Sequence, residues 1–202
     1  MILKHKNENI KIVLVEPLGP INLGSVARLC ENFGIKELRL VSPKCDPFDI
    51  EVRRMALKGM KLIEDAPRFS TLLDAVQDCV RVIATCGRID HGDIPLHSPQ
   101  NALSWFLESA TNDSIAIVFG REDRGLTNQE LLLAQKVISI STPSDYPSLN
   151  LSHAVAIILY ELSNCTQKHE KINLTKPNNP SSTKELNDCL NVTRDFLLEI
   201  GF

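Results

Sequence analysis

Five short apolar runs without regular polar alternation constrain the fold of this chain more than any other feature. They span Ile10 to Val15, Leu38 to Val41, Val80 to Ala84, Ile115 to Phe119 and Val137 to Ile140. Strands that are buried on both faces have this pattern, whereas a half-exposed strand alternates apolar and polar residues. Helix-length segments separate the runs, and two begin with a capping residue: Ser98 before Pro99, and Thr127 before the segment Asn128 to Ala134. Strands that alternate with helices predict an α/β fold with a parallel sheet covered on both faces.

The polarity of the sequence changes towards the C-terminus and divides the chain into three parts. Residues 1–164 form the predicted main domain, since 43% hydrophobic content over 202 residues is enough for a substantial core. Residues 165–182 are mostly polar and contain the run NNPSS, which predicts a flexible linker. In residues 183–202, Thr183 is the expected N-cap of a last helix whose apolar residues lie partly on one face.

Composition narrows the class of protein. No segment approaches the roughly 20 apolar residues of a membrane span, and the start of the chain lacks a secretory signal pattern, so we expect a cytoplasmic protein without a membrane partner. The six cysteines contain no C-x-x-C pair, which predicts neither a metal site nor a disulfide framework. A net charge of -3 counts against a nucleic-acid binder. A local cluster of cations, Arg53, Arg54, Lys58 and Lys61, leaves RNA binding open.

The first apolar run leads into the sequence NLGSVAR, Asn22 to Arg28. Asn22 is a candidate helix cap, and Gly24 allows another backbone to approach closely. Arg28 lies almost two turns further along the same predicted helix, where a surface arginine is the simplest interpretation. No G-x-G-x-x-G follows the run, which argues against a dinucleotide-dependent oxidoreductase.

Two more loops follow apolar runs directly. VFGREDRGL, Val118 to Leu126, has glycines at positions 120 and 125 around four charged residues. A solvated turn would explain the charges, but the two glycines suit a backbone packed against a ligand. The loop that begins Thr85-Cys86-Gly87-Arg88 has small residues that either leave room for a flat ligand or simply connect a strand to a helix.

The fourth junction is PSLNL, residues 147–151, at the start of an apolar helix predicted from Leu149 to Leu162. Ser148 and Asn150 are good helix caps, and capping alone would explain them. However, all four loops stand at the carboxyl ends of predicted parallel strands, where open α/β sheets bind ligands. The chain contains no G-x-S-x-G elbow, P-loop or H-E-x-x-H, so the commoner hydrolytic chemistries are excluded.

In this order, NLGSVAR, VFGREDRGL and STPSDYPSLNLSHAVAIILYEL resemble the three signature motifs of the SpoU/TrmH group of the SPOUT superfamily. The resemblance covers Ile10 to about Leu162. The group consists of S-adenosylmethionine-dependent RNA 2′-O-ribose methyltransferases, and the sequence is most similar to members that modify cytidine or uridine in tRNA, at position 32 of the anticodon loop. The resemblance implies a parallel-sheet α/β domain with a deep C-terminal trefoil knot, followed here by a short C-terminal helical extension.

The resemblance also implies a set of site residues, with S-adenosylmethionine as methyl donor and no metal. The residues expected to bind the donor are Thr85, Cys86, Gly87, Gly120, Ile140, Pro147, Ser148 and Leu149. The polar residues expected to serve catalysis are Arg28, Asn22, Glu122, Ser148 and Asn150.

The roles implied for these residues concern the ribose 2′-hydroxyl, which attacks the donor methyl. Arg28 would accept its proton or would orient the neighbouring phosphate, and both roles stay open because free arginine has a pKa above about 12. Glu122 would hold Arg28 by a charge-assisted hydrogen bond, and Asn150 would orient the substrate or a loop of a second subunit. The implied partners are tRNA and a second copy of the chain. Alternative hypotheses are methylation of another tRNA or rRNA site, and a non-catalytic RNA-binding module.

Overall fold

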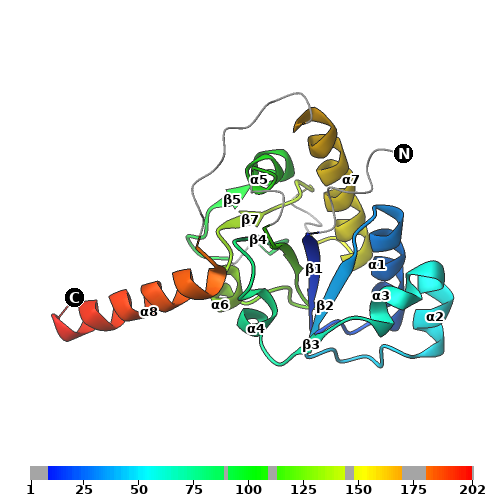
Figure 1. Cartoon of the computed structure of the whole chain (residues 1–202), viewed down its shortest axis with the longest axis horizontal. Coiled ribbons are helices and arrows are strands. Elements are labelled where there is room, and N and C mark those ends of the chain that lie inside the picture. The colour runs from blue at the N-terminus through cyan, green and yellow to red at the C-terminus, as the bar shows by residue number, and fades with distance from the viewer. Residues whose placement is uncertain (1–8, 89–90, 109–112, 144–147, 170–180, 202) are drawn as a thin grey trace.

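A single seven-stranded sheet, in which all strands are parallel, forms the centre of the computed structural model (Figure 1). The structure describes residues 9–88, 91–108, 113–143, 148–169 and 181–201. The strand order is β3-β2-β1-β6-β4-β7-β5. The strands are β1 (Ile10–Val15), β2 (Glu37–Val41), β3 (Arg68–Phe69), β4 (Arg81–Thr85), β5 (Leu96–His97), β6 (Ile115–Phe119) and β7 (Lys136–Ile138). The predicted parallel α/β sheet is confirmed.

Helices cover both faces of the sheet and create two separate cores. On one face, Ile12 and Leu14 of β1 pack with residues of α1, α5 and α7, while Val13 and Val15 point to the other face, towards α4 and α6. A strand buried on both sides needs apolar residues at successive positions, which explains the apolar runs in the sequence. The helices are α1 (Pro20–Asn32), α2 (Ile50–Ala56), the 3-10 turn η1 (Leu57–Gly59), α3 (Met60–Glu64), α4 (Leu72–Val76), α5 (Pro99–Phe106), α6 (Asn128–Leu131), α7 (Leu151–His169) and α8 (Thr183–Glu199).

Side-chain caps start several of these helices. The Ser98 hydroxyl accepts from the Asn101 N–H, with Pro99 at the first helical position, and Thr127 forms a capping box with Glu130, so both predicted caps are confirmed. The expectation that Asn22 caps α1 is wrong, because α1 already begins at Pro20 and Gly19 is its cap residue. A proline favours the first turn of a helix, and Pro20 therefore moves the start three residues upstream.

The C-terminal segment departs from the predicted boundaries. Helix α7 continues to His169, five residues into the predicted linker, because Cys165 and Thr166 are still buried against the body. Residues 170–180, the rest of that linker except 181–182, lie outside the described residues. Ser182, rather than Thr183, caps α8 through a capping box with Glu185. Thr183 instead donates its hydroxyl to the carbonyl of Cys79 at 2.7 Å and fixes the start of α8 to the domain.

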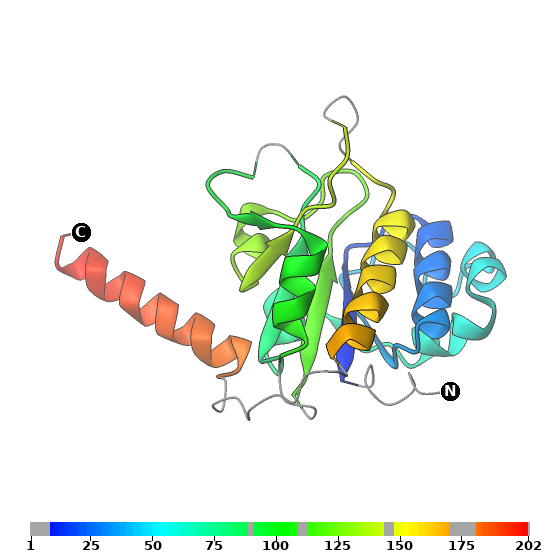
Figure 2. The ribbon, with the colours of Figure 1, turned by 90° about the horizontal axis from the view of Figure 1, so that it is seen from above.

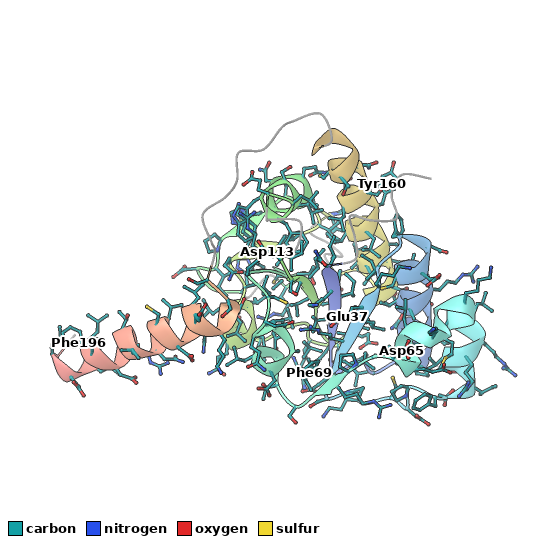
Figure 3. The ribbon with its side chains drawn as sticks, in the orientation of Figure 1. Glu37, Asp65, Phe69, Asp113, Tyr160 and Phe196 are labelled. Carbon is teal, nitrogen blue, oxygen red and sulfur yellow. The ribbon has the colours of Figure 1, made fainter. Side chains whose placement is uncertain are left out.

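Helix α8 then extends away from the domain (Figure 2). Phe196, near its outer end, is 58% exposed, and Figure 3 places it far from the sheet. The predicted knot involves the chain between β7 and α7, and residues 144–147 of that connection lie outside the described residues. Among the helices of the described residues, none combines the length and the apolar character needed to cross a membrane.

Candidate functional site

A cavity of about 390 Å³ lies at the carboxyl ends of β4, β6 and β7, beside the start of α7. This is the edge at which open parallel sheets bind ligands, and the volume is typical of small-molecule sites. Three of the four loops singled out in the sequence line it. The lining residues are Thr85, Cys86, Gly87, Arg88, Phe119, Gly120, Arg121, Glu122, Asp123, Arg124, Gly125, Ile138, Ile140, Ser148, Leu149, Leu151 and Ala154.

A chain of hydrogen bonds joins the loops around this cavity. The Asn150 amide donates to the side-chain oxygen of Asn22 at 3.0 Å, and the Asn22 amide donates to Glu122 at 3.2 Å. Asn150 also accepts from the Ser152 N–H at 2.9 Å, so it caps α7 at the same time. Its oxygen therefore caps the helix while its amide nitrogen joins the hydrogen-bond chain beside the cavity.

Glu122 receives further hydrogen bonds from the N-terminal end of α1. Its two carboxylate oxygens accept from the backbone N–H groups of Leu18 at 2.9 Å and Gly19 at 3.0 Å. The positive end of the helix dipole stabilises a carboxylate in this position. Glu122 thus fixes the loop after β1 to the loop after β6.

The expected hydrogen bond between Glu122 and Arg28 is not formed within the chain. Arg28 is exposed, does not line the cavity, and forms no hydrogen bond or ion pair with another described residue. The physical reason is that Glu122 already uses both oxygens at the start of α1, whereas Arg28 lies two turns further along that helix.

The structure brings most of the expected donor-binding residues together. The cavity is lined by Thr85, Cys86, Gly87, Gly120, Ile140, Ser148 and Leu149 from that set, and by Glu122 and Ser148 from the polar set. Asn22 and Asn150 stand behind the cavity wall, in the network with Glu122. Pro147 lies outside the described residues.

Gly120 and Gly125 shape the loop after β6. A Cβ at Gly120 would stand 2.4 Å from the carbonyl carbon of Gly125 and 2.4 Å from the nitrogen of Leu126, so two backbone segments touch where the loop closes. Gly125 has a φ of +67°, a conformation that glycine adopts readily. The loop therefore presents a tight, backbone-lined wall to the cavity.

Arg121 anchors the same loop through hydrogen bonds to Glu16 and Glu130. Its guanidinium donates to Glu130 at 2.9 and 3.0 Å and to Glu16 at 2.8 Å, and its side chain is only 7% exposed. The hydrogen bond from Arg121 lowers the pKa of Glu16. Burial alone would raise the pKa of Glu130, but the hydrogen bonds from Arg121 and Thr127 outweigh it and lower that pKa. Arg121 thus ties the ends of β1 and β6 to α6.

Replacing Arg121 by methionine is expected to lower the free energy of unfolding by roughly 3–5 kcal/mol at pH 7, because two largely buried carboxylates lose their cation. The carboxylates stabilise the wild type above their unfolded pKa near 4.5, and this contribution is lost as the pH falls through their lower folded pKa. The difference between wild type and variant should therefore shrink below about pH 4. Urea unfolding between pH 3 and pH 7, in steps of roughly half a unit, measures it.

Arg124→Met is the matched control for this change. Arg124 contacts the same Glu16 at 3.4 Å, but its side chain is 64% exposed. An exposed ion pair contributes about 0–1 kcal/mol, so the control should unfold almost as the wild type does. Equal losses in both variants would contradict the anchoring role of Arg121.

Several cavity residues were not predicted from the sequence. Phe119, Ile138, Leu151 and Ala154 form apolar walls, and nothing in a continuous apolar run distinguishes a wall residue from a core residue. Arg121 and Arg124 stand three positions apart in one charged loop, and the sequence carries no signal that one is buried.

The described part of the chain contains no group of three or more histidine, cysteine, aspartate or glutamate side chains placed to hold a metal ion. Among the charged groups at the cavity, Glu122 accepts from backbone N–H groups, Arg121 donates to Glu16 and Glu130, and Arg88 donates to Asn128. This edge is suited to bind an organic ligand through backbone groups, small side chains and a few polar contacts.

A parallel open sheet with such a cavity at its carboxyl edge defines an α/β protein whose loops after β4, β6 and β7 form a cavity suited to a small organic ligand. Comparison with known proteins gives the family. The model of the SpoU rRNA Methylase family matches residues 9–160, and the chain belongs to this family of RNA methyltransferases.

The chain is similar to relatives and solved structures of this family. It is 37% identical, over 88% of its length and 77% of the relative's, to a tRNA (cytidine-2'-O-)-methyltransferase TrmJ of Methanocaldococcus jannaschii. The crystal structure of TrmJ from Z. mobilis ZM4 superposes with a TM-score of 0.78 at 30% identity, covering 95% of this chain and 80% of that one. A structure described as giving insights into the 2-OH methylation of C/U34 on tRNA superposes with a TM-score of 0.62 at 25% identity, covering 78% and 91%.

Proposed function

We propose that this protein transfers a methyl group from S-adenosylmethionine to the 2′-hydroxyl of a pyrimidine ribose in the anticodon loop of tRNA. The observation that carries the proposal is the cavity at the carboxyl edge, whose wall is built from the loops after β4 and β6 and the start of α7 and is backed by the Asn22–Glu122–Asn150 network. Relatives named as tRNA 2′-O-methyltransferases support the substrate and the reaction.

The cavity fits the donor chemically. Ile140 and Leu149 offer apolar walls to an adenine ring, and the tight Gly120 turn lets backbone groups approach a ribose. S-adenosylmethionine supplies an electrophilic methyl group on a positively charged sulfur. The carboxylates of Glu122 and Asp123 line the cavity, and their charge favours a cation there.

The residues of the chain must orient the ribose and assist the loss of its proton. A hydroxyl is a weak nucleophile, so holding it in line with the methyl group contributes much of the acceleration. In the proposal Arg28 binds the phosphate next to the reacting ribose, since its guanidinium is exposed and matches a phosphate with two parallel hydrogen bonds. As the oxygen–carbon bond forms, the bond between the methyl carbon and the donor sulfur breaks, and the proton of the 2′-hydroxyl passes to solvent.

The position of Arg28 outside its own cavity supports a dimeric site. In the proposal two copies associate through α1 and α7, and Arg28 of one copy serves the cavity of the other. Exposed apolar side chains on these helices are available for the contact: Ile21 is 51% exposed and Tyr160, labelled in Figure 3, is 58% exposed. The deep trefoil knot belongs to the same proposal, with α7 following the threaded segment.

Incubation with S-adenosylmethionine and unmodified tRNA tests the function. Purified protein should transfer one methyl group per tRNA and make one linkage in the anticodon loop resistant to alkaline hydrolysis, because 2′-O-methylation blocks attack by the ribose oxygen on the phosphate. The resistant linkage should lie at position 32, as the sequence resemblance implies, while position 34 would match the relative described for C/U34.

A tRNA that carries 2′-deoxyribose at the mapped nucleotide is the matched control. It preserves base and backbone but lacks the acceptor, so transfer at that nucleotide should disappear. Methylation that persists on the deoxy substrate would place the methyl group on a base and would refute ribose methylation. Absence of any transfer to tRNA or rRNA would instead favour a non-catalytic module.

A further inference from the structure

A second surface at the carboxyl edge of the sheet lies outside the cavity, on the loop after β2 and the neighbouring edge strand β3. This loop is continuous with the loop after β1, because the carbonyl of Pro17 accepts from the N–H groups of Lys44 and Cys45 at 3.0 and 3.2 Å. Lys44 also lies 3.7 Å from Glu16. The loops after β1 and β2 therefore lie side by side at the carboxyl edge of the sheet.

Phe48 is an exposed aromatic residue at the centre of this surface. It is 42% exposed, and the guanidinium groups of Arg53 and Arg68 lie 5.9 and 5.5 Å from its ring centroid. Both distances fall within the range of cation–π contacts. We call these three residues the Phe48 platform. They come from the loop, from α2 and from β3, so the fold rather than local sequence assembles them.

The loop holds Phe48 in a defined position. Asp46 accepts from the Phe48 N–H at 2.9 Å, and Asp49 accepts from the Glu51 N–H at 2.7 Å as the cap of α2. These two carboxylates are thus engaged with the backbone. An exposed aromatic ring held by its own loop is prepared for a stacking partner, because little entropy is lost when the partner arrives.

The arginines of the platform are largely unpaired. Among the described residues, Arg68 has no carboxylate within ion-pair distance, and Arg53 has only Glu64 at 3.9 Å, with both side chains about half exposed. Exposed Arg54, Lys58 and Lys61 lie further along α2, η1 and α3, where exposed Glu51, Glu64 and Asp65 also lie. The cations that stand directly around the aromatic ring are therefore Arg53 and Arg68.

We infer that the Phe48 platform binds an unpaired nucleotide of the substrate RNA, with its base stacked on Phe48 and its phosphate held by Arg53 and Arg68. An aromatic ring accepts any base, and a guanidinium fork matches a phosphate, so the combination suits single-stranded RNA. The inference rests on the proposed function and adds a contact outside the cavity. β3 lies three strands from β6, or roughly 14 Å, so the platform would hold a nucleotide other than the one that reacts.

Binding of an unmodified tRNA transcript, measured without donor at several salt concentrations, tests the platform. Phe48→Leu and Phe48→Ala should each weaken binding roughly ten-fold and leave the salt dependence unchanged, because stacking involves no ion release. Arg68→Gln should weaken binding and reduce the slope of log K against log salt by about 0.7, the value of one phosphate contact on a single strand. Donor affinity and melting temperature should stay at the wild-type values in all three variants.

Leu132→Ala is the matched control, since Leu132 is 69% exposed at the end of α6, on the other face of the sheet. It should bind RNA as the wild type does. If the wild type methylates tRNA while the Phe48 and Arg68 variants keep full affinity and an unchanged slope, the platform inference is overturned and the proposed function stands. If the wild type binds no RNA at all, both are overturned.

Discussion

Gly120→Ala is expected to lower the affinity for S-adenosylmethionine by roughly 10- to 100-fold and the free energy of unfolding by roughly 1–3 kcal/mol. The added methyl group would stand 2.4 Å from backbone atoms of both Gly125 and Leu126. Backbone atoms in a closed turn cannot move aside cheaply, so the loop has to open at the point where it forms the cavity wall. Titration calorimetry with the donor, together with urea unfolding, measures the two effects separately.

Gly24→Ala is the matched control, because it introduces a comparable clash away from the cavity. Its Cβ would stand 2.6 Å from the carbonyl oxygen of Val52 and 2.7 Å from the Cβ of Met55, between α1 and α2. This variant should lose a similar amount of stability and keep its donor affinity. If Gly120→Ala bound the donor as tightly as Gly24→Ala, the cavity would not be the donor site.

Arg28→Ala is expected to reduce methyl transfer by roughly 100- to 10,000-fold while donor affinity and stability stay unchanged. The side chain is exposed, has no partner among the described residues and does not line the cavity, so its removal disturbs neither packing nor donor contacts. Single-turnover transfer to tRNA at saturating donor measures the loss. Arg28→Lys should recover part of the rate if the residue holds a phosphate, because the charge is kept although the fork is lost.

Co-expression of two impaired variants, assayed at a donor concentration that saturates the wild type but not Gly120→Ala, tests whether Arg28 works across a dimer. When Arg28→Ala and Gly120→Ala chains are co-expressed, half of the dimers should be mixed, and each mixed dimer has one site with an intact arginine and an intact cavity. About a quarter of the wild-type activity should then return. If the purified mixed dimers stayed inactive, Arg28 would have to serve the cavity of its own chain.

The central strands were predictable because their burial on two faces leaves a direct trace in the sequence. Ile115–Phe119 and Ile10–Val15 are found with the predicted bounds, and the other three runs differ by one or two residues at their ends. The edge strands β3 and β5 contain two residues each, too few to show any periodicity. Helix α7 extends beyond its predicted end at Leu162, because Cys165 and Thr166 are buried although their neighbours in the sequence are polar.

The candidate site was predictable as a set of loops but not as a set of contacts. Glycines and polar residues after the apolar runs indicated which loops meet at the sheet edge. Which side chains pair there depends on the distances between the loops, and these distances cannot be read from the sequence. Glu122 was therefore assigned to Arg28, while the structure pairs it with the start of α1 and with Asn22. Arg121 and Arg124 have a similar sequence context, yet the side chain of Arg121 is buried and that of Arg124 is exposed.

The polar network behind the cavity has a consequence for the timing of activity during synthesis. Its hydrogen bonds join residues that are 100 positions apart, Asn22 and Glu122, and 128 positions apart, Asn22 and Asn150. The ribosome delivers the chain from its N-terminus, so a nascent chain can assemble β1, α1 and β2 long before Asn150 has been made. A chain that is still being translated thus has no finished site, and in the proposed function it cannot modify the tRNAs that pass through its own ribosome.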